Sequence, residues 1–460
     1  MRDPTNRIAR LICMMGAVIL IPAVCRGQTG KPMQPPPESQ VLRLSLKEAI
    51  EIALAPDGNS RVQLAMETVN VAKSRSAQSL ASLLPNLEAS VGQQSQTRNL
   101  AALGIRFNAP FPGFQFPTFV GPFNTFDARA TLSQSIFDFS SIRRFQASRV
   151  GVQQAKAEDE STRDLTRDQV ARAYLAALRA EAQRETAKAN VTLAEALLKL
   201  AENQKSAGTG TGIEVTRARV QLANESQRLL VAQNARNKAH LQLLRAMGLR
   251  LEVRLDLGDP LTYSPVTITS LEQALKTALE SRADWKAQEK REQGQRLNYS
   301  ATKMERLPSV AGLADYGSIG SSINNAIPTR TYGFAVRVPV FDGGRRDARR
   351  AESFSQLRQE SIRTHDLREQ IELEVRVALD NLQSAEDQVK AAEEGLRLSE
   401  EELAQAQRRY QAGVSNGLEV TDAQTRLERA RENQIAALFN HNLARIELST
   451  ATGTIRKMVE

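Results

Sequence analysis

The chain repeats part of itself, and this internal duplication restricts its fold more than any other feature of the 460 residues. A shift of 205 positions places residues 207–216 on residues 412–421, and six of the ten pairs are identical. Residues 84–85 align with residues 307–308 at a shift of 223, so the two halves differ in length. The additional residues of the first half lie around 98–126. A duplication of this kind predicts two copies of one structural unit.

Each half is predicted to contain a helix, two strands, a very long helix, a tight turn and a returning helix. In the second half, apolar and small residues recur at steps of four and three from Ile371 to Tyr410, which is the heptad pattern of a coiled coil. Few helix breakers lie between Gly344 and Ala412, so this helix is predicted to span 69 residues, or about 100 Å. Its counterpart spans residues 140–207. A helical hairpin of this length has no globular core of its own and must bundle with other helices.

Short segments in which apolar and polar residues alternate precede each long helix. The alternation is clearest at residues 332–340, is also present at 87–92 and 128–136, and is weaker at 310–316. Strands of about ten residues with one apolar side suit a transmembrane barrel, although a soluble hairpin in each half would show the same pattern. Four strands are too few for such a barrel, so copies of the chain would have to combine. Two copies supply eight strands and three supply twelve, and only the wider barrel would leave a water-filled bore.

The first 27 residues have the form of a secretory signal peptide. Three arginines precede an apolar run of 15 residues, and small residues flank the expected cleavage site after Gly27. The run is short for a membrane-spanning helix, which needs about 20 residues. The alternative is lipidation of Cys25, for which the preceding valine is unfavourable. Cleavage after Gly27 would remove both cysteines of the chain.

The duplication and the signal peptide together predict five segments. The signal peptide is followed by a Pro-rich leader at residues 28–43. The first repeat spans residues 44–250, a connector spans 251–268, and the second repeat spans 269–460.

The composition argues against an enzyme and against a nucleic-acid-binding protein. The 61 Lys and Arg and 52 Asp and Glu residues are interleaved and not clustered. Two Cys and three scattered His leave too few ligands for a metal site. The glycine-rich segment 208–212 follows a helix and lacks the Lys-Ser/Thr of a phosphate-binding loop. No nucleophile or acid–base constellation stands out, so we expect no catalysis, no metal and no cofactor.

Nearly all of the mature chain, from Leu44 to Gly453, resembles the TolC-like outer-membrane efflux factors. The most specific motifs are Leu-Pro-Asn-Leu at residues 84–87, Val-Pro-Val-Phe-Asp-Gly-Gly at 338–344, and Arg-Tyr-Gln-Ala-Gly from residue 409, followed by Leu-Glu-Val-Thr-Asp-Ala from residue 418. The resemblance implies an α+β membrane protein that forms a homotrimer. Each chain would give four strands to a 12-stranded outer-membrane β-barrel, which a long α-helical coiled-coil tunnel continues into the periplasm.

The resemblance also implies a function and a set of partners. The protein would be the exit duct of a tripartite efflux or type I secretion system, and it would conduct substrates passively to the exterior. Its partners would be a periplasmic adaptor (membrane fusion) protein, an inner-membrane RND or ABC pump, and outer-membrane lipid. The sequence does not identify whether the cargo is a drug, a metal or a protein. A secreted periplasmic coiled-coil scaffold or adaptor without a pore would explain the heptads, but not the paired strands.

The family closes its periplasmic end with a ring of acidic residues, and the matching positions here are Glu419 and Asp422. They are three residues apart and therefore share one helix face. Stabilisation of a helix N-terminus would explain both acids without a gate. The first repeat keeps Glu214 and has Arg217 in place of Asp422, so we predict that Arg217 latches the closed tip against one of the two acids. Tyr410 matches a family tyrosine that holds the closed tip, and its heptad position equally suits a core role.

The turns that end the long helices are the predicted docking sites for the adaptor, although turn chemistry alone would also explain their glycines. Ser415 departs from the family, in which this position is often basic. The predicted docking residues are Ala207, Gly208, Gly212, Ala412, Gly413, Val414 and Ser415.

Overall fold

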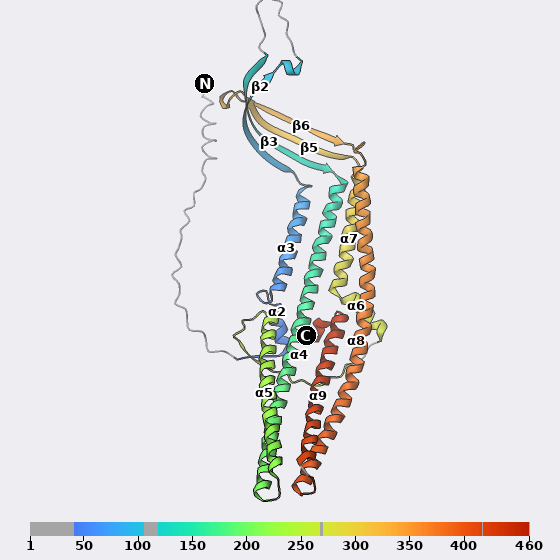
Figure 1. The fold of residues 1–460 in the computed structure, drawn as a ribbon. Coiled ribbons are helices and arrows are strands. Elements are labelled where there is room, and N and C mark those ends of the chain that lie inside the picture. The colour runs from blue at the N-terminus through green and yellow to red at the C-terminus, as the bar shows by residue number, and fades with distance from the viewer. Residues whose placement is uncertain (1–40, 105–117, 267–269, 416, 460) are drawn as a thin grey trace, which may run out of the picture. The chain divides into compact units, whose positions relative to one another are not determined.

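Two long helical hairpins and a four-stranded sheet make up most of the chain in the computed structural model (Figure 1). The structure describes residues 41–104, 118–266, 270–415 and 417–459. Residues 42–460 form one unit, which is considered by itself below. The predicted signal peptide and the alternative lipidation site at Cys25 lie outside the described residues.

The hairpins reproduce the duplication closely. The first consists of α4 (Phe139–Ser206, 68 residues) and α5 (Gly212–Met247), and the second of α8 (Arg345–Gln411, 67 residues) and α9 (Gly417–Ala451). The bounds predicted for the two long helices are confirmed to within one residue at each end.

Within the part of the chain that the structure describes, no helix has a stretch long and apolar enough to cross a membrane.

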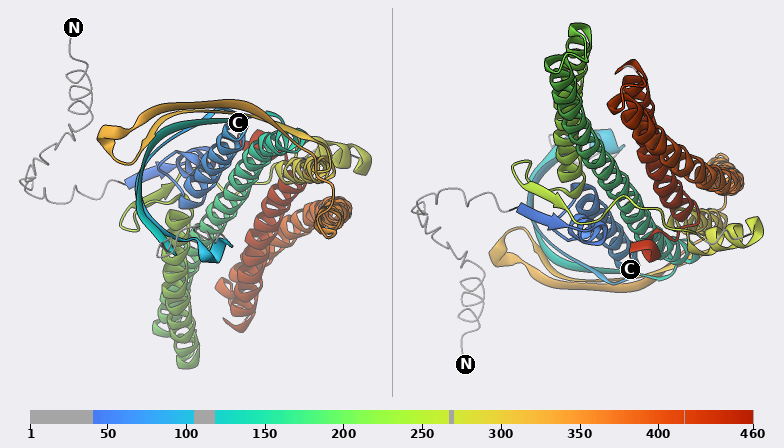
Figure 2. Two further views of the ribbon diagram at one scale, coloured as in Figure 1. Left: turned by 90° about the horizontal axis from the view of Figure 1, so that it is seen from above. Right: turned by 90° about the horizontal axis from the view of Figure 1, so that it is seen from below.

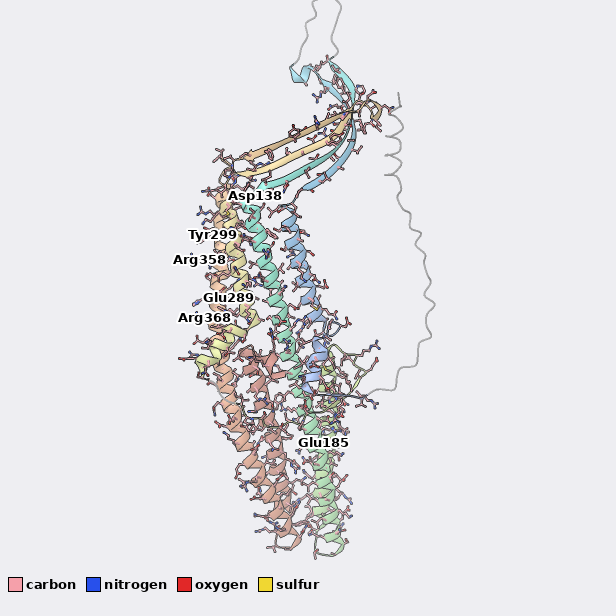
Figure 3. The ribbon with its side chains drawn as sticks, turned by 180° about the vertical axis from the view of Figure 1, so that it is seen from behind. Asp138, Glu185, Glu289, Tyr299, Arg358 and Arg368 are labelled. Carbon is pink, nitrogen blue, oxygen red and sulfur yellow. The ribbon has the colours of Figure 1, made fainter. Side chains whose placement is uncertain are left out.

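A Phe-Asp pair precedes the first turn of each long helix. The Asp138 carboxylate accepts hydrogen bonds from the backbone N–H groups of Ser140 at 3.0 Å and Ser141 at 3.2 Å, which would otherwise have no partner in the helix. Figure 3 labels Asp138 at the junction between the sheet and α4. In the second repeat, Asp342 accepts from the backbone N–H of Arg346 at 3.1 Å.

The heptad seam of α8 faces the interior of the bundle, as predicted. Ile371, Val375 and Leu382 are fully buried at one end of the seam, and Ala406 is buried at the other. Between them, three seam positions in the C-terminal third of the helix are only half-buried: Ala392, Leu396 and Ser399. Packing along the hairpin is therefore tight towards its two ends and looser between them.

The helix predicted ahead of the strands is divided in two in each repeat. The pieces are α2 (Leu46–Leu54) and α3 (Ser60–Ala81) in the first repeat, and α6 (Leu271–Ser281) and α7 (Ala283–Met304) in the second. The sequence pattern also missed β1 (Val41–Leu44), which pairs with β4 (Arg254–Leu257), and the short helix α10 (Ile455–Val459). Strands of four residues are too short to show a period of two.

The largest apolar core lies where the two repeats meet. It joins α2, α4 and α5 of the first repeat to α9 and α10 of the second, through residues such as Ile50, Val170, Leu243, Ile446 and Ile455. Neither repeat buries its apolar surface alone, so the two must fold together.

The connector between the repeats is fixed to this core. The carboxylate of Asp259 accepts a hydrogen bond from the hydroxyl of Tyr174 at 2.8 Å and another from the backbone N–H of Leu46, also at 2.8 Å. The tyrosine hydroxyl also lies 3.0 Å from the carbonyl oxygen of Leu44.

The sheet contains two strands from each repeat in the order β2-β3-β5-β6, with every neighbouring pair antiparallel. The strands are β2 (Asn86–Asn99), β3 (Phe119–Phe137), β5 (Ser309–Gly320) and β6 (Ile327–Arg337). Figure 2 shows that the sheet curves. The alternation predicted to residue 340 extends too far, because β6 ends at Arg337. Pro339, which lacks a backbone N–H, lies just beyond that end.

The register divides the side chains of the sheet between two chemically different faces. Leu87 lies opposite Leu132, which in turn lies opposite Ala314, and Ala314 lies opposite Tyr332. Residues directly opposite one another share a face. One face is largely apolar and exposed, with Leu87, Val91, Leu132, Tyr316, Tyr332, Phe334 and Val336. The other is mostly polar, with Glu88, Ser90, Asp127, Arg129, Thr131, Asp315, Thr331 and Arg337.

Candidate functional site

The turns of the two hairpins have the same construction. In each, a glycine with a positive φ lies two residues after the last residue of the long helix, with φ of 80° at Gly208 and 70° at Gly413. L side chains rarely adopt this conformation. Ala207 and Ala412 precede these glycines, and their backbone N–H groups still donate to the helix, to the carbonyls of Asn203 and Arg408.

The predicted docking residues are confined to these two turns and to the first residue of α5. Most of them are exposed, and Val414 is 70% exposed. The hydroxyl of Ser415 is the exception, because it is buried and has no hydrogen-bond partner among the described atoms.

An apolar cluster joins the hairpins just above the turns. Leu403, Tyr410 and Leu427 from the second hairpin form its buried part, and Leu193 and Leu197 from α4 pack against it. Tyr410 is 7% exposed. The core role allowed for Tyr410 by its heptad position is therefore seen in the structure.

Glu214 links the starts of the two returning helices. Its Oε2 atom accepts a hydrogen bond from the backbone N–H of Thr211 at 2.9 Å, which caps α5. This bond, and a further one from the backbone N–H of Gly417, lower the pKa of the Glu214 carboxyl below its usual range. Because both N–H groups lie at helix N-termini, the carboxylate is held at the positive ends of two helices.

The five predicted gate residues fall into two groups. Glu214, Arg217 and Tyr410 line one small pocket between the hairpins, together with Gly417 and other residues of α4, α5 and α9. The positive charge of Arg217 contributes to the lowered pKa of Glu214.

Glu419 and Asp422 do not line that pocket. Glu419 forms an ion pair with Arg409 of its own hairpin at 3.1 Å, and Asp422 is exposed. Among the ion pairs of the described residues, none joins Arg217 to Asp422, so the latch stays a prediction. The sequence pattern did not identify Arg409 as a partner, although it belongs to the Arg-Tyr-Gln-Ala-Gly motif.

Replacing Glu214 with alanine should loosen the tip of the first hairpin without unfolding the bundle. Loss of a helix cap costs about 1 kcal/mol, so transient opening near the turn should increase about fivefold. Because the pKa of Glu214 is lowered in the folded chain, its contribution is present at neutral pH and is lost as the pH falls. The measurement is the rate of trypsin cleavage after Arg217 at neutral pH.

The matched control for this prediction is Glu195→Ala, because Glu195 lies on an exposed face within α4. Equal cleavage rates in Glu214→Ala and wild type would contradict the bridging role of Glu214.

Within the described residues, no group of three or more His, Cys, Asp or Glu side chains is placed to hold a metal ion. The three histidines have ordinary surroundings. His441 is buried against the ring of Tyr263, His240 lies 3.7 Å from Glu181, and His365 lies 3.3 Å from Glu369.

Comparison with known proteins supports a fold and a family. The family model described as outer membrane efflux protein matches residues 53–249 and 274–454. The pyoverdine export outer membrane protein OpmQ of Pseudomonas putida is 25% identical over 343 residues, which cover 72% of this chain and 70% of OpmQ. The alkaline protease secretion protein AprF of Pseudomonas aeruginosa is 26% identical over 233 residues. That match covers 48% of this chain and 47% of AprF, about half the length of each.

The structural likeness extends over most of the chain. The structure of the outer-membrane channel OprN superposes with a TM-score of 0.76 at 17% identity, covering 89% of this chain and 90% of OprN. The TolC-like fold predicted from the sequence, with four strands and two long helical hairpins in each chain, is confirmed.

Proposed function

This chain belongs to the outer membrane efflux protein family, and from that premise we propose that three copies of it form a passive exit duct through the outer membrane. The family's place is the outer membrane, and its members are efflux and secretion channels. The trimer, the passive conduction and the partners are parts of the proposal.

The observation that carries the proposal is the sheet. Within the described residues, β2 and β6 each have a neighbour on one side only, so a row of backbone N–H and C=O groups is left on each outer edge. Because the four strands alternate in direction, β6 of one copy would run antiparallel to β2 of the next. A ring of copies can therefore close without a free edge, and three copies supply twelve strands.

The apolar face of the sheet supports the same assembly. Tyr332 is 82% exposed and Phe334 is 80% exposed in the single chain. Aromatic side chains on an outward face suit contact with lipid, and the polar face suits a water-filled bore. An exposed apolar surface of this kind marks an interaction site in a folded protein.

We assign the closed end of the duct to the hairpin tips. Glu419 and Asp422 would form the acidic ring of the trimer, and Glu214, Arg217 and Tyr410 would hold the two hairpins of each chain together. The exposed turns at 207–212 and 412–415 would receive the periplasmic adaptor.

The proposed partners are this adaptor and an inner-membrane pump of the RND or ABC class, where the energy for transport is spent. The two relatives carry different cargoes by name, pyoverdine for OpmQ and alkaline protease for AprF. We therefore assign the choice of cargo to the pump and not to this chain. A coiled-coil scaffold without a pore would leave the exposed apolar face of the sheet without a role.

The test combines fractionation with electrophysiology. We expect the full chain to be recovered in the outer-membrane fraction as a trimer, and the purified trimer to form pores in planar lipid bilayers. A water-soluble monomer that produces no conductance would overturn the proposal.

A further inference from the structure

Two buried carboxylates and a half-exposed arginine join the two hairpins farther from the tips than the proposed gate. Glu225 and Arg228 come from α5, and Glu428 comes from α9. The side chain of Glu225 is fully buried and that of Glu428 is 7% exposed. The guanidinium of Arg228 donates to Glu225 at 2.9 Å and to Glu428 at 2.7 Å, so it bridges the first hairpin to the second.

Two carboxyl oxygens of this group have no hydrogen-bond partner among the described atoms. The Oε1 atom of Glu225 accepts from Arg228 and, at 3.0 Å, from Gln221. Its Oε2 atom is buried without a donor, and so is Oε1 of Glu428. Leaving a buried acceptor without a donor is costly, more so when it is charged. One added proton would turn one of the acids into a donor to the other.

This group is not a consequence of the duplication. At the shift of 205 residues, Glu225 corresponds to Ala430 and Glu428 corresponds to Ala223. Arg228 corresponds to Asn433. The three ionisable residues therefore occur together only at this contact. The positions that correspond to them in the other repeat hold two alanines and an asparagine.

The surroundings of Glu225 favour its neutral form. Burial raises the pKa of Glu225, the negative charge of Glu428 and a hydrogen bond between the two carboxyl groups raise it further, and Arg228 opposes them. Glu432 of α9 adds a smaller effect in the same direction. On the side of α4, the polar residues that line the same cavity as Glu225 are Gln183, Thr186 and Asn190. The side-chain oxygen of Asn190 accepts from Arg431 at 3.2 Å.

We propose that Glu225 and Glu428 share one proton and, with Arg228, form a proton-dependent clasp between the two hairpins. In the clasped form, neutral Glu225 donates its O–H to the Glu428 carboxylate, and Arg228 balances the one remaining negative charge. Release of the proton to solvent leaves two carboxylates against one guanidinium. The resulting unbalanced charge in a buried site favours separation of the hairpins, which hydrates it.

The direction of the pH effect follows from the sign of the proton uptake. The clasped form binds one proton more than the separated form, so it is favoured at low pH and is lost as the pH rises. The ratio of separated to clasped forms should rise by at most about tenfold for each pH unit. Separation of the hairpins can be measured without a pore. This inference therefore rests on the proposed function only where it would apply to conduction through the duct.

The experiment measures that separation directly. Residues 28–460 contain no cysteine, so spin labels can be placed at the exposed turns with Ala207→Cys and Ala412→Cys in the full chain. Labelled chains are diluted with unlabelled ones, so that each distance belongs to one chain. Between about pH 5 and about pH 9, we expect the wild-type distances to lengthen, and we expect Glu225→Gln to abolish the change. The glutamine amide keeps a donor at all pH values.

Two further variants make the test decisive. Glu428→Gln should also abolish the pH response, because it removes the same shared proton from the other side. Glu402→Gln is the matched control, because Glu402 pairs with Arg426 on the exposed surface of the second hairpin and should respond as wild type. The proposal is overturned if the wild-type distances do not change with pH, or if Glu225→Gln and Glu428→Gln respond as wild type does.

Discussion

Replacing Gly317 with alanine is expected to abolish the assembled outer-membrane form of this protein. Gly317 lies in β5, opposite Arg129 of β3, at the junction where the strands of the two repeats pair. A Cβ atom at this position would overlap the carbonyl oxygen of Ala128 and the Cβ of Arg129. The first of these atoms belongs to the backbone, and the position of the second is set by the backbone of β3. Neither can move aside without breaking the hydrogen bonds between β3 and β5.

The overlap is expected to lower the free energy of unfolding by about 3 kcal/mol in each chain, and the effect would occur three times in a trimer. Gly333→Ala is the matched control, because it also adds one methyl group in a strand, but nothing in the same chain lies within 4 Å of the new atom. The measurement is the amount of heat-stable trimer in the outer-membrane fraction. Normal trimer in Gly317→Ala would show that the pairing of β3 with β5 is not as described.

Replacing Tyr410 with alanine is expected to open the hairpin tips. The ring fills the cluster that joins α4 to the second hairpin, and truncation of a buried aromatic side chain costs about 3–5 kcal/mol. Because this cluster lies next to the turns, the cost falls on closure of the tip and not on the distant sheet. A bias of only about 1.4 kcal/mol towards the open form raises its population about tenfold.

Single-channel recording in planar bilayers would detect the change as a higher conductance or a longer open time. Tyr410→Phe is the control, because it retains the ring and its packing while removing only the hydroxyl. It should behave as wild type. Wild-type conductance and open time in Tyr410→Ala would assign the closed state to other residues.

The sequence predicted the hairpins well because their signal is local and long. The heptads that end at Tyr410 indicate where a long helix extends, and the glycines at 208 and 413 indicate where the long helices end. Both signals depend only on residues that are neighbours along the chain. The division of the leading helix into α6 and α7 was missed, because the break at Arg282 has no glycine or proline to mark it.

The candidate site was predicted in part. The motif positions located the turns, and the structure brings Glu214, Arg217 and Tyr410 to one pocket. The sequence did not reveal that Glu214 contacts both helix starts, or that Arg409 pairs with Glu419. These partners come from different elements, and the choice among the many arginines and glutamates of the chain depends on helix rotation and distance in space.

Alone, the amino-acid sequence determined the twofold repeat, the lengths of the long helices and the alternation of the strands, because each is a period or a break along one segment. Only the tertiary structure decided how the repeats share one core, which strands are neighbours and which charges meet in buried positions. Glu225 and Glu428 are about 200 residues apart, and each corresponds to an alanine in the other repeat. They meet because the tertiary structure brings side chains of α5 and α9, which belong to different repeats, to one site. Burial there changes the energy of a charge that would be unperturbed in water.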